Sequence, residues 1–395
     1  MKILMLTPYL PYPLLSGGQI RTYNLLKNLA DRHEISLLSF IREDNEKEYV
    51  NELLKYCRDV KVIVRRKAWD WRNIALSGLT PYPFLVSIYL SLSLKKLIKK
   101  ELSCQKYDLI HAETFYVMPN LPKTNLPILL VEQTIEYLVY QNFVENFNFF
   151  PVKPFLYFDV AKIQYWEKYY WKQAARLATM STEDKKIVEQ SVKNTKVDIV
   201  ANGVDVDFFE ATKIYKPTRP SILFVGNFKW LPNKDAACFL AKKVWPIIKK
   251  KLPDANLWIV GKNPTEEIKN LAGRDVKIDE KIEDIREAFG KASVLLAPIR
   301  NGRGTKYKVL EAMATGLPVV TTRLGIEGIE AKDRQEVLFA ETSQDLADKT
   351  ILLLKSKTLG QKIAKKAKKL VAEKYNWKII SANLDKIYQD LGKND

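Results

Sequence analysis

The sequence is poor in cysteine and histidine. It has 3 Cys and 2 His among 395 residues, and Cys57, Cys104 and Cys238 lie far apart without CxxC spacing. These counts exclude a disulfide framework, a structural zinc site and a multi-histidine metal centre. No apolar run reaches the ~18 residues of a membrane span. The N-terminus, broken early by Pro8, is too short for a secretory signal. We therefore expect a cytoplasmic protein.

Acidic residues are also few relative to basic ones: 46 Asp and Glu stand against 64 Lys and Arg, for a net charge of +18. Such an excess favours anionic partners, namely nucleic acid, acidic lipid or phosphorylated small molecules. The sequence has no zinc finger, no RNA-binding aromatic signature and no basic-zipper heptads, so we rank nucleic acid last. At ~100–200 residues per domain, the length predicts two domains.

Short β-branched runs alternate with helical patterns in both halves of the chain. This alternation predicts an α/β protein with two doubly wound parallel sheets. The predicted strands are 2–6, 34–40, 60–64, 109–112 and 128–131, then 197–201, 222–225, 256–260, 294–297 and 318–321. The predicted helices include 19–31, 235–252, 307–315 and 377–391. In such sheets ligands bind beyond the carboxyl ends of the strands, so the loops there are the candidate sites.

Polar residues follow three strands of the first half. Gly17 and Gly18 lead into the first helix, where glycine lets the backbone approach a ligand and the helix start offers N–H groups to an anion. The alternative is a flexible loop. His111 is expected at the carboxyl edge of the sheet, with Glu132 and Glu136 after the next strand. The alternatives are a structural histidine and two solvated glutamates.

In the second half, a strand ends in Val225 and is followed by Gly226, Asn227 and Lys229. The alternative to a ligand loop is a plain turn with an exposed lysine. The sequence contains neither GxGxxG nor a Walker A motif, so dinucleotide and P-loop interpretations lack support.

A glycine-rich, basic segment, 301–306, runs into the start of another helix. N–H groups and the helix dipole favour a diphosphate there. Lys308 and Glu311 are three residues apart and share one face of this helix. That face could hold a phosphate with the lysine and ribose hydroxyls with the glutamate. The alternative is a solvated ion pair.

The run Lys308–Val320, KVLEAMATGLPVV, resembles the signature of retaining nucleotide-sugar glycosyltransferases of family 4, the group 1 superfamily. Further matches follow in order along nearly the whole chain: the Gly17-Gly18 loop, His33-Glu34-Ile35, His111, Ser181 with Asp184, Asn202-Gly203-Val204-Asp205 and Val225-Gly226. The resemblance implies the GT-B fold, two Rossmann-like domains facing a central cleft. It implies an acceptor-side domain over 1–195, on which helix 376–395 packs back, and a nucleotide-sugar-binding domain over 196–375.

The resemblance also implies roles for single residues. Glu311 is expected to bind the ribose hydroxyls of the donor. The other implied donor-binding residues are Gly17, Gly18, Gly226, Asn227, Lys229, Gly304, Thr305 and Lys306, and the implied catalytic residues are His111, Lys308 and Arg303. The family needs no metal or other cofactor, because basic side chains and helix N–H groups stabilise the leaving diphosphate. It uses no carboxylate nucleophile of the glycosidase type.

Two positions depart from the family pattern. Arg303 stands eight residues before Glu311, where the family often has a second Glu that touches the donor sugar. Asn227 stands where an Arg often follows the strand-end glycine, and our hypothesis is that Lys229 substitutes for that Arg. The first departure puts the identity of the donor sugar in question.

The implied function is a retaining transferase of the hexosyltransferase type. It moves a sugar from a nucleotide-diphosphate sugar to a saccharide or lipid-linked acceptor, in the synthesis of a cell-surface polysaccharide or glycolipid. The alternatives are an epimerase or hydrolase of nucleotide sugars on the same fold and, because of Arg303, a non-catalytic nucleotide-sugar binding protein. Segments 81–97 and 143–171 set aromatic residues beside lysines, which suits peripheral contact with an acidic membrane surface at the inner face of the cell membrane. Helices packed on the sheet with snorkelling lysines are the alternative.

Overall fold

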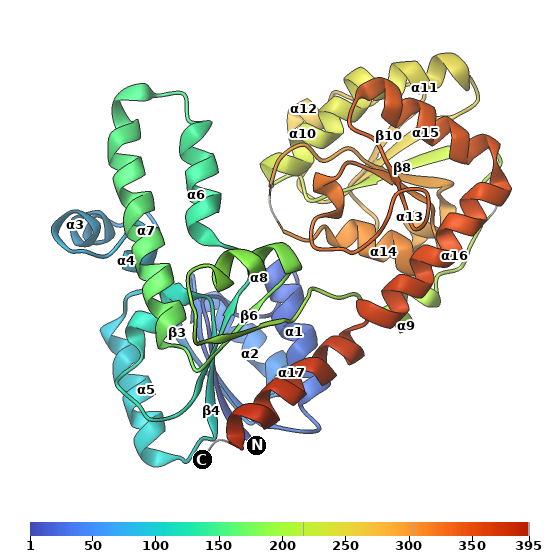
Figure 1. Ribbon diagram of the computed structural model, residues 1–395. Helices are drawn as coiled ribbons and strands as arrows, with labels where there is room; N and C mark the ends of the chain where they lie inside the picture. Colours follow the sequence, from blue (N-terminus) through green and yellow to red (C-terminus); the bar gives the residue numbers. More distant parts are fainter. Residues whose placement is uncertain (216, 303, 394–395) are drawn as a thin grey trace. The chain divides into compact units, whose positions relative to one another are not determined.

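The computed structural model describes residues 1–215, 217–302 and 304–393. The chain forms two compact units (Figure 1). Unit 1 contains Met1–Ala201 and the chain from Ile380 onward, and unit 2 contains Asn202–Ile379. The chain therefore passes from one unit to the other twice.

Unit 1 is built on a seven-stranded sheet in the order β3-β2-β1-β4-β5-β6-β7, and all its strand pairs are parallel. The strands are β1 (Lys2–Thr7), β2 (Glu34–Ile41), β3 (Asp59–Val64), β4 (Leu109–Glu113), β5 (Ile128–Glu132), β6 (Arg176–Thr179) and β7 (Lys196–Ile199). The strand order reverses between β1 and β4. This switch point is where doubly wound sheets bind their ligands.

The helices of unit 1 cover both faces of this sheet, and α6 and α7 stand up from it as a pair (Figure 1). They are α1 (Gly17–Leu29), η1 (Asp44–Tyr49), α2 (Val50–Leu53), α3 (Trp71–Leu79), α4 (Phe84–Tyr89), α5 (Leu92–Cys104), η2 (Phe115–Asn120), α6 (Glu136–Glu145), η3 (Phe150–Val152), α7 (Lys153–Gln173), α8 (Thr182–Glu189) and most of α17 (Trp377–Gly392). The core between helices and sheet contains fully buried Phe40, Phe115 and Trp171.

Unit 2 repeats the architecture with a six-stranded parallel sheet in the order β10-β9-β8-β11-β12-β13. Its strands are β8 (Ser221–Val225), β9 (Asn256–Val260), β10 (Val276–Asp279), β11 (Val294–Ala297), β12 (Val319–Thr321) and β13 (Leu338–Phe339). Its helices are α9 (Val206–Glu210), α10 (Leu231–Phe239), η4 (Leu240–Val244), α11 (Trp245–Lys251), α12 (Glu266–Lys269), α13 (Ile285–Lys291), α14 (Tyr307–Thr315), η5 (Leu324–Ile326), α15 (Ser343–Lys355) and α16 (Lys357–Lys374). The switch point here lies between β8 and β11.

The prediction of two doubly wound α/β halves is confirmed, but the strand predicted over 197–201 was assigned to the wrong half. It is β7, which pairs with β6 at the edge of the first sheet. Unit 1 therefore ends at Ala201 rather than at 195. The short strands β6, β10 and β13 were not predicted.

The helix predicted over 235–252 begins earlier, at Leu231, and is not regular. It contains a π-helical turn, Leu240–Val244, directly before Trp245 and Pro246. Proline has no N–H to donate to the preceding turn, which accounts for the change in hydrogen bonding at this point.

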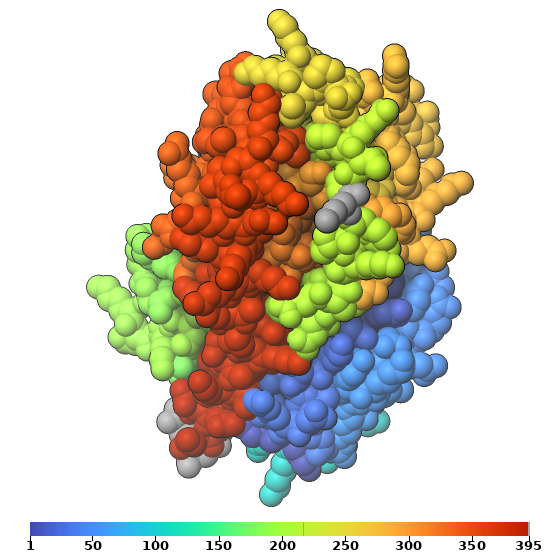
Figure 2. Space-filling model, turned by 90° about the vertical axis from the view of Figure 1, so that its right-hand side faces the viewer, coloured from blue at the N-terminus to red at the C-terminus, as the bar shows by residue number. Residues whose placement is uncertain are grey.

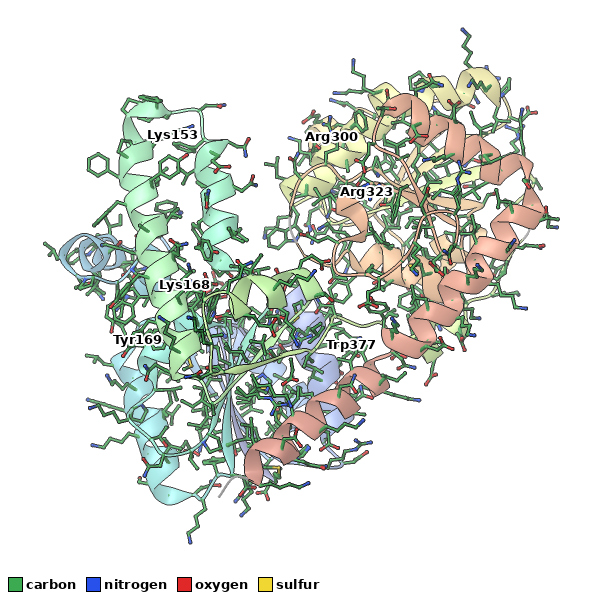
Figure 3. The ribbon with its side chains drawn as sticks, viewed as in Figure 1. Lys153, Lys168, Tyr169, Arg300, Arg323 and Trp377 are labelled. Carbon is green, nitrogen blue, oxygen red and sulfur yellow. The ribbon has the colours of Figure 1, made fainter. Side chains whose placement is uncertain are left out.

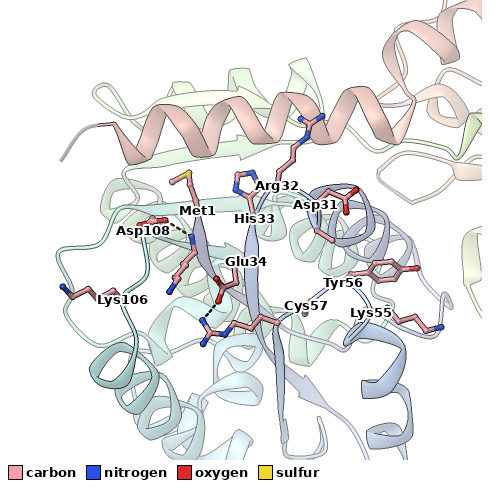
Figure 4. Close-up of a pocket in the computed structure, with 13 residues that line it drawn as sticks. Met1, Asp31, Arg32, His33, Glu34, Lys55, Tyr56, Cys57, Lys106 and Asp108 are labelled. Carbon is pink, nitrogen blue, oxygen red and sulfur yellow. Dashed lines mark hydrogen bonds and ion pairs between the residues drawn. The ribbon is translucent and has the colours of Figure 1, made fainter.

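The predicted last helix, 377–391, is α17, and it is held to unit 1 by buried polar contacts. Asp385 accepts a hydrogen bond from Arg32 Nη1 at 2.8 Å, and its other oxygen lies 2.8 Å from His33 Nε2. Figure 4 shows Arg32 and His33 beneath this helix.

The exposed charge of one helix and the apolar character of the helices bear on the partners of the protein. The lysines of α16 are mostly exposed, and this helix lies on the face seen in Figure 2. Among the described residues, no helix combines the length and the apolar character that crossing a bilayer requires.

Candidate active site

The segment after β11 forms a tight loop that ends at the start of α14. Gly302 and Gly304 have φ values of +88° and +85°, a region in which a side chain is strained. Lys306 Nζ donates to the carbonyl oxygens of both glycines, at 3.1 and 2.5 Å. Lys306 is also the N-cap of α14 but makes no side-chain hydrogen bond to the helix start. The helix start therefore has no capping side chain and suits an anion.

Lys308 lies in the first turn of α14 and points toward the loop after β8. Its Nζ donates to Oδ1 of Asn233 at 2.6 Å and lies 4.5 Å from the centre of the Phe224 ring. Asn233 in turn donates to the carbonyl oxygen of Asn227 at 2.9 Å. Asn233, in the first turn of α10, thus links the start of α14 to the loop after β8. Sequence reasoning missed it, because nothing local relates residue 233 to residue 308.

Glu311 follows Lys308 by one helical turn, and both side chains are partly buried. Among the described residues, none donates a hydrogen bond to the Glu311 carboxylate. Burial raises the pKa of Glu311 to about 7, against the opposing effect of the Lys308 charge. Burial, together with the charge of Lys306, lowers the pKa of Lys308 to about 7. The surrounding protein groups therefore compensate the charges of this cluster poorly, and a bound anion would stabilise the charged form of its lysines.

Lys306 shows the same effect. Burial lowers the pKa of Lys306 to about 8, although the Glu327 carboxylate, 3.9 Å away, works in the opposite direction. Glu327 also accepts a hydrogen bond from the N–H of Gly304 at 2.8 Å. The loop is further tied to the unit by Asn202, whose amide donates to Thr305 Oγ1 at 3.3 Å and accepts from the Tyr307 hydroxyl at 3.1 Å.

The loop after β8 contains the other predicted donor-binding residues. Gly226 comes directly after the strand, and its carbonyl oxygen is approached so closely by Gly261 that a Cβ on Gly261 would lie 1.6 Å away. Asn227 Oδ1 accepts from the N–H of Lys229 and from Asn263 Nδ2, both at 3.1 Å, so this side chain closes a turn. The Lys229 side chain is exposed.

In unit 1, Gly17 and Gly18 open α1 at the carboxyl end of β1, with Ser16 as the N-cap. A Cβ on Gly18 would lie 1.8 Å from the Tyr9 hydroxyl oxygen and 2.6 Å from Gln133 Oε1. Those two groups share a 2.7 Å hydrogen bond. A side chain at this position would therefore displace the ends of Tyr9 and Gln133 and disturb their hydrogen bond, whatever ligand the loop binds.

His111 does not lie at the edge of the sheet as predicted. It is the third residue of β4, paired with Met5 and Leu129 of the neighbouring strands, and its side chain is fully buried. Its Nδ1 lies 2.5 Å from the Tyr388 hydroxyl of α17, and its Nε2 lies 3.3 Å from Glu113 Oε1. The strand extends two residues beyond the histidine, which keeps the ring inside. The catalytic role predicted for His111 stays a prediction.

Glu113, the last residue of β4, extends the buried polar contacts of His111 to the carboxyl edge of the sheet. Its Oε2 accepts from Gln133 Nε2 at 2.8 Å. Burial raises the pKa of Glu113, but contact with His111 and the charge of Arg21 outweigh this effect and hold it below the usual value. The next residue, Thr114, has φ of +73° and is buried. Such strain in a non-glycine residue is typical of functional sites.

The glutamates predicted after β5 are less solvated than a surface position implies. Glu132 is fully buried and accepts from Trp171 Nε1 at 2.9 Å. Glu136 opens α6, and burial raises its pKa to about 7. Glu167 of α7 accepts from the N–H groups of Glu136 and Tyr137, at 2.8 and 3.1 Å, and so caps α6.

The structure therefore brings Lys306, Lys308 and Glu311 together in unit 2, and Gly18 close to the His111 network in unit 1. Arg303, predicted to be catalytic, lies outside the described residues. Across 1–215, 217–302 and 304–393, no three His, Cys, Asp or Glu side chains form a group that could hold a metal ion.

A pocket of about 880 Å³ opens elsewhere, at the amino edge of the first sheet (Figure 4). It is lined by Met1, His33, Glu34, Arg58 and Asp108, among others. Arg58 is paired with Glu34, and Asp108 accepts from the N–H of Lys2. Because parallel α/β sheets bind ligands at the carboxyl edge, this pocket is not the active-site candidate.

Comparison with known proteins agrees with this geometry. The family model described as Glycosyltransferase Family 4 matches residues 15–208, and the model described as Glycosyl transferases group 1 matches residues 219–356. An uncharacterised glycosyltransferase of Methanocaldococcus jannaschii is 24% identical over 406 residues, covering 99% of both chains. The phosphatidyl-myo-inositol mannosyltransferase of Mycobacterium tuberculosis is 26% identical over 204 residues, 48% of this chain and 53% of the relative.

The crystal structure of Anabaena HepE in complex with UDP has the same fold. Its TM-score is 0.67 at 15% identity, over 99% of this chain and 100% of that one. The two parallel Rossmann-like sheets are those of the GT-B fold. With one family model over each unit, the chain belongs to the family 4, group 1 glycosyltransferases and is a glycosyltransferase of the GT-B fold.

Proposed function

We propose that the protein is a retaining glycosyltransferase that uses a nucleotide-diphosphate sugar as its donor. One observation carries the donor class: two partly buried lysines, Lys306 and Lys308, and the carboxylate of Glu311 meet at an uncapped helix start. Lysines with lowered pKa values beside the positive end of a helix suit a diphosphate. A carboxylate one turn further suits the two hydroxyls of a ribose.

The relatives support the same donor class. The Anabaena structure contains UDP, and a related crystal form of that protein contains UDP-glucose. The mycobacterial relatives are named as mannosyltransferases. These names bear on the donor and leave the base and the sugar open for this chain.

The chemistry follows from the charges of the cluster. When the bond between the anomeric carbon and the diphosphate breaks, negative charge grows on the diphosphate oxygen. Lys306, Lys308 and the start of α14 stabilise that charge. Because the site is partly desolvated, the electrostatic attraction is stronger there than in water. The resemblance to the family adds Arg303, which lies outside the described residues, as a further proposed catalytic residue. No step needs a metal ion or another cofactor, and we propose that the enzyme works without one.

Unit 1 would bind the acceptor. Gly17 and Gly18 keep the first loop free of side chains. Glu136, at the start of α6 after β5, is partly exposed and can accept a hydrogen bond from a hydroxyl group. In this proposal His111 acts through its contact with Glu113, which accepts a hydrogen bond from Gln133. We propose a saccharide or lipid-linked acceptor, in the synthesis of a cell-surface polysaccharide or glycolipid. The proposed location is the cytoplasm, at the inner face of the cell membrane.

A transfer assay tests this function. The enzyme is incubated with UDP-, GDP- and ADP-linked hexoses and with saccharide and lipid-linked acceptors, and the product is examined by NMR. We expect transfer from donors of one base, with the anomeric configuration kept, and a loss of about 100-fold or more in Lys308→Met, on the scale of other charge-stabilising groups. An inverted product would contradict retention. Free sugar released equally with and without every acceptor would contradict transfer.

A further inference from the structure

Exposed aromatic and aliphatic side chains gather on α3 and α7 of unit 1 and on the segments that precede them. Trp69 is 81% exposed, Leu79 87% and Phe150 78%. Isolated exposed apolar residues are ordinary, but a gathering of them marks an interaction surface. We call this surface the aromatic face; its members are Trp69, Trp71, Ile74, Leu79, Phe149, Phe150, Phe155, Phe158, Tyr165 and Tyr169.

The members on α7 form a single stripe. Positions 155, 158, 165 and 169, with Lys162 between them, are spaced by three or four residues, so they share one side of the helix. The buried residues of α7, among them Ile163 and Trp171, lie on its opposite side. Helix α7 therefore has two separate sides: one packs in the core of unit 1, and the other carries the exposed stripe.

Hydrogen bonds fix α3 beside this stripe. Lys162 Nζ donates to the carbonyl oxygens of Ser77 and Thr80 at the end of α3, at 2.6 and 3.0 Å. The Ser77 hydroxyl donates to Asp159 of α7 at 3.2 Å. These contacts place the end of α3 beside the middle of α7, on the side of α7 that is turned away from α6 in Figure 1.

Lysines outnumber acidic residues around the aromatic face, although Asp70 lies between Trp69 and Trp71 and caps α3. Helix α7 has four lysines and two acids, and both acids are turned inward: Asp159 accepts from the N–H of Phe84 at 2.9 Å, and Glu167 caps α6. Figure 3 shows Lys153 at the free end of α7 and Lys168 beside Tyr169 nearer its base. The segment before α3 adds the exposed Lys67, whereas the Arg66 guanidinium donates to Asn73 and to the carbonyl oxygens of Ser87 and Leu90.

We propose that the aromatic face is a membrane-docking surface that binds a bilayer containing acidic lipids. Phe, Trp and Tyr are the side chains that settle at the boundary of headgroups and acyl chains, and lysines beside them pair with anionic headgroups. A second copy of this chain is a poorer occupant, because it would set lysine against lysine. A bilayer also suits a projecting surface without a groove. This inference rests on the proposed location at the membrane and not on the identity of the donor.

Vesicle flotation tests the proposal with the full chain. The protein is mixed with vesicles of phosphatidylcholine, with or without phosphatidylglycerol, and floated through a density gradient. We expect flotation with the acidic vesicles, reduced by raised salt, and at least a tenfold loss in the double variant Phe155→Ser, Phe158→Ser. The matched control is Ile214→Ser, Leu352→Ser, which removes two exposed apolar side chains from unit 2 and should float as the unchanged protein does.

A second readout locates the contact. Brominated lipid should quench the fluorescence of Trp69 and Trp71, and Trp69→Phe, Trp71→Phe should lose most of that quenching. Nucleotide-dependent thermal shifts in all variants show that unit 2 is intact, which separates failure of docking from failure of the proposed donor site. Absence of flotation in the unchanged protein would overturn the proposal. So would flotation that the Phe155, Phe158 variant retains, or a dimer that this variant abolishes without any vesicle binding.

Discussion

The Nδ1 atom of His111 lies 2.5 Å from the hydroxyl oxygen of Tyr388, so a central strand of the first sheet and the last helix of the chain share a buried hydrogen bond. His33 approaches the same tyrosine, with ring centres 5.3 Å apart, and contacts Asp385 one turn earlier. Both histidines of the sequence thus hold α17 in place. They act in the fold rather than as exposed acids or bases.

Removing the Tyr388 hydroxyl should therefore destabilise unit 1. Tyr388→Phe leaves His111 Nδ1 buried without its partner, which costs about 1–3 kcal/mol. Denaturant unfolding followed by tryptophan fluorescence measures the loss. Tyr157→Phe, at an exposed tyrosine, is the control and should change nothing. Equal stability of the Tyr388→Phe variant would show that this hydrogen bond does not hold the helix.

The attachment of α17 should also weaken in mild acid. Burial lowers the pKa of His33 despite its contact with Asp385. A base whose folded pKa is lowered binds fewer protons in the folded state, so its stabilising effect is complete above its unfolded pKa of about 6.5 and is lost as the pH falls below that value. Thermal unfolding at several pH values should show this loss. The slope should shrink in His33→Gln, and an unchanged slope would assign the effect elsewhere.

Gly18→Ala should damage the first loop, while Gly78→Ala should not. A Cβ at position 18 meets the Tyr9 hydroxyl at 1.8 Å, whereas no atom lies within 4 Å of one at position 78. Gly78 is the second-last residue of α3, so the second change should stabilise by less than the roughly 1 kcal/mol of a helix-interior site. We expect Gly18→Ala to lower Tm and transfer activity together. If Gly18→Ala keeps both, the Tyr9–Gln133 hydrogen bond does not constrain this loop.

Nucleotide binding should draw protons from solution. The pKa is about 8 for Lys306 and about 7 for Lys308, so near pH 8 both are partly neutral. A bound diphosphate favours the charged lysines and raises both pKa values, so binding takes up protons and weakens as the pH rises. Calorimetry in two buffers of different ionisation enthalpy gives the number of protons taken up per nucleotide bound. It should fall in Lys308→Met, and proton release instead of uptake would contradict the assigned contacts.

The sequence predicted some elements closely and others not at all. Helix α14 has the predicted bounds, because its apolar period is regular and Gly316, with φ of +80°, ends it. The contact of Lys308 with Asn233 joins residues that are 75 positions apart, and no local pattern contains it. His111 was misplaced because a strand's end cannot be read to within two residues, and two residues decide whether a side chain lies inside the sheet or at its edge.

The same reasoning applies to β7. A four-residue strand just before a domain boundary matches either sheet by its pattern, and only its pairing with β6 assigns it to unit 1. The aromatic run 143–171 was rightly noticed, but its division into a core face and an exposed face depends on how α7 packs.

The central claim is that the Lys308–Glu311 cluster binds a nucleoside diphosphate, and a thermal-shift series with UDP, GDP and ADP tests it most directly. Ligand at ~100 times its Kd adds about 2.7 kcal/mol to the free energy of unfolding. We predict a rise in Tm with one of the three, lost in Glu311→Ala and kept in Glu341→Ala, an exposed glutamate elsewhere in unit 2. No rise with any of them, or a rise that Glu311→Ala retains in full, would contradict the claim.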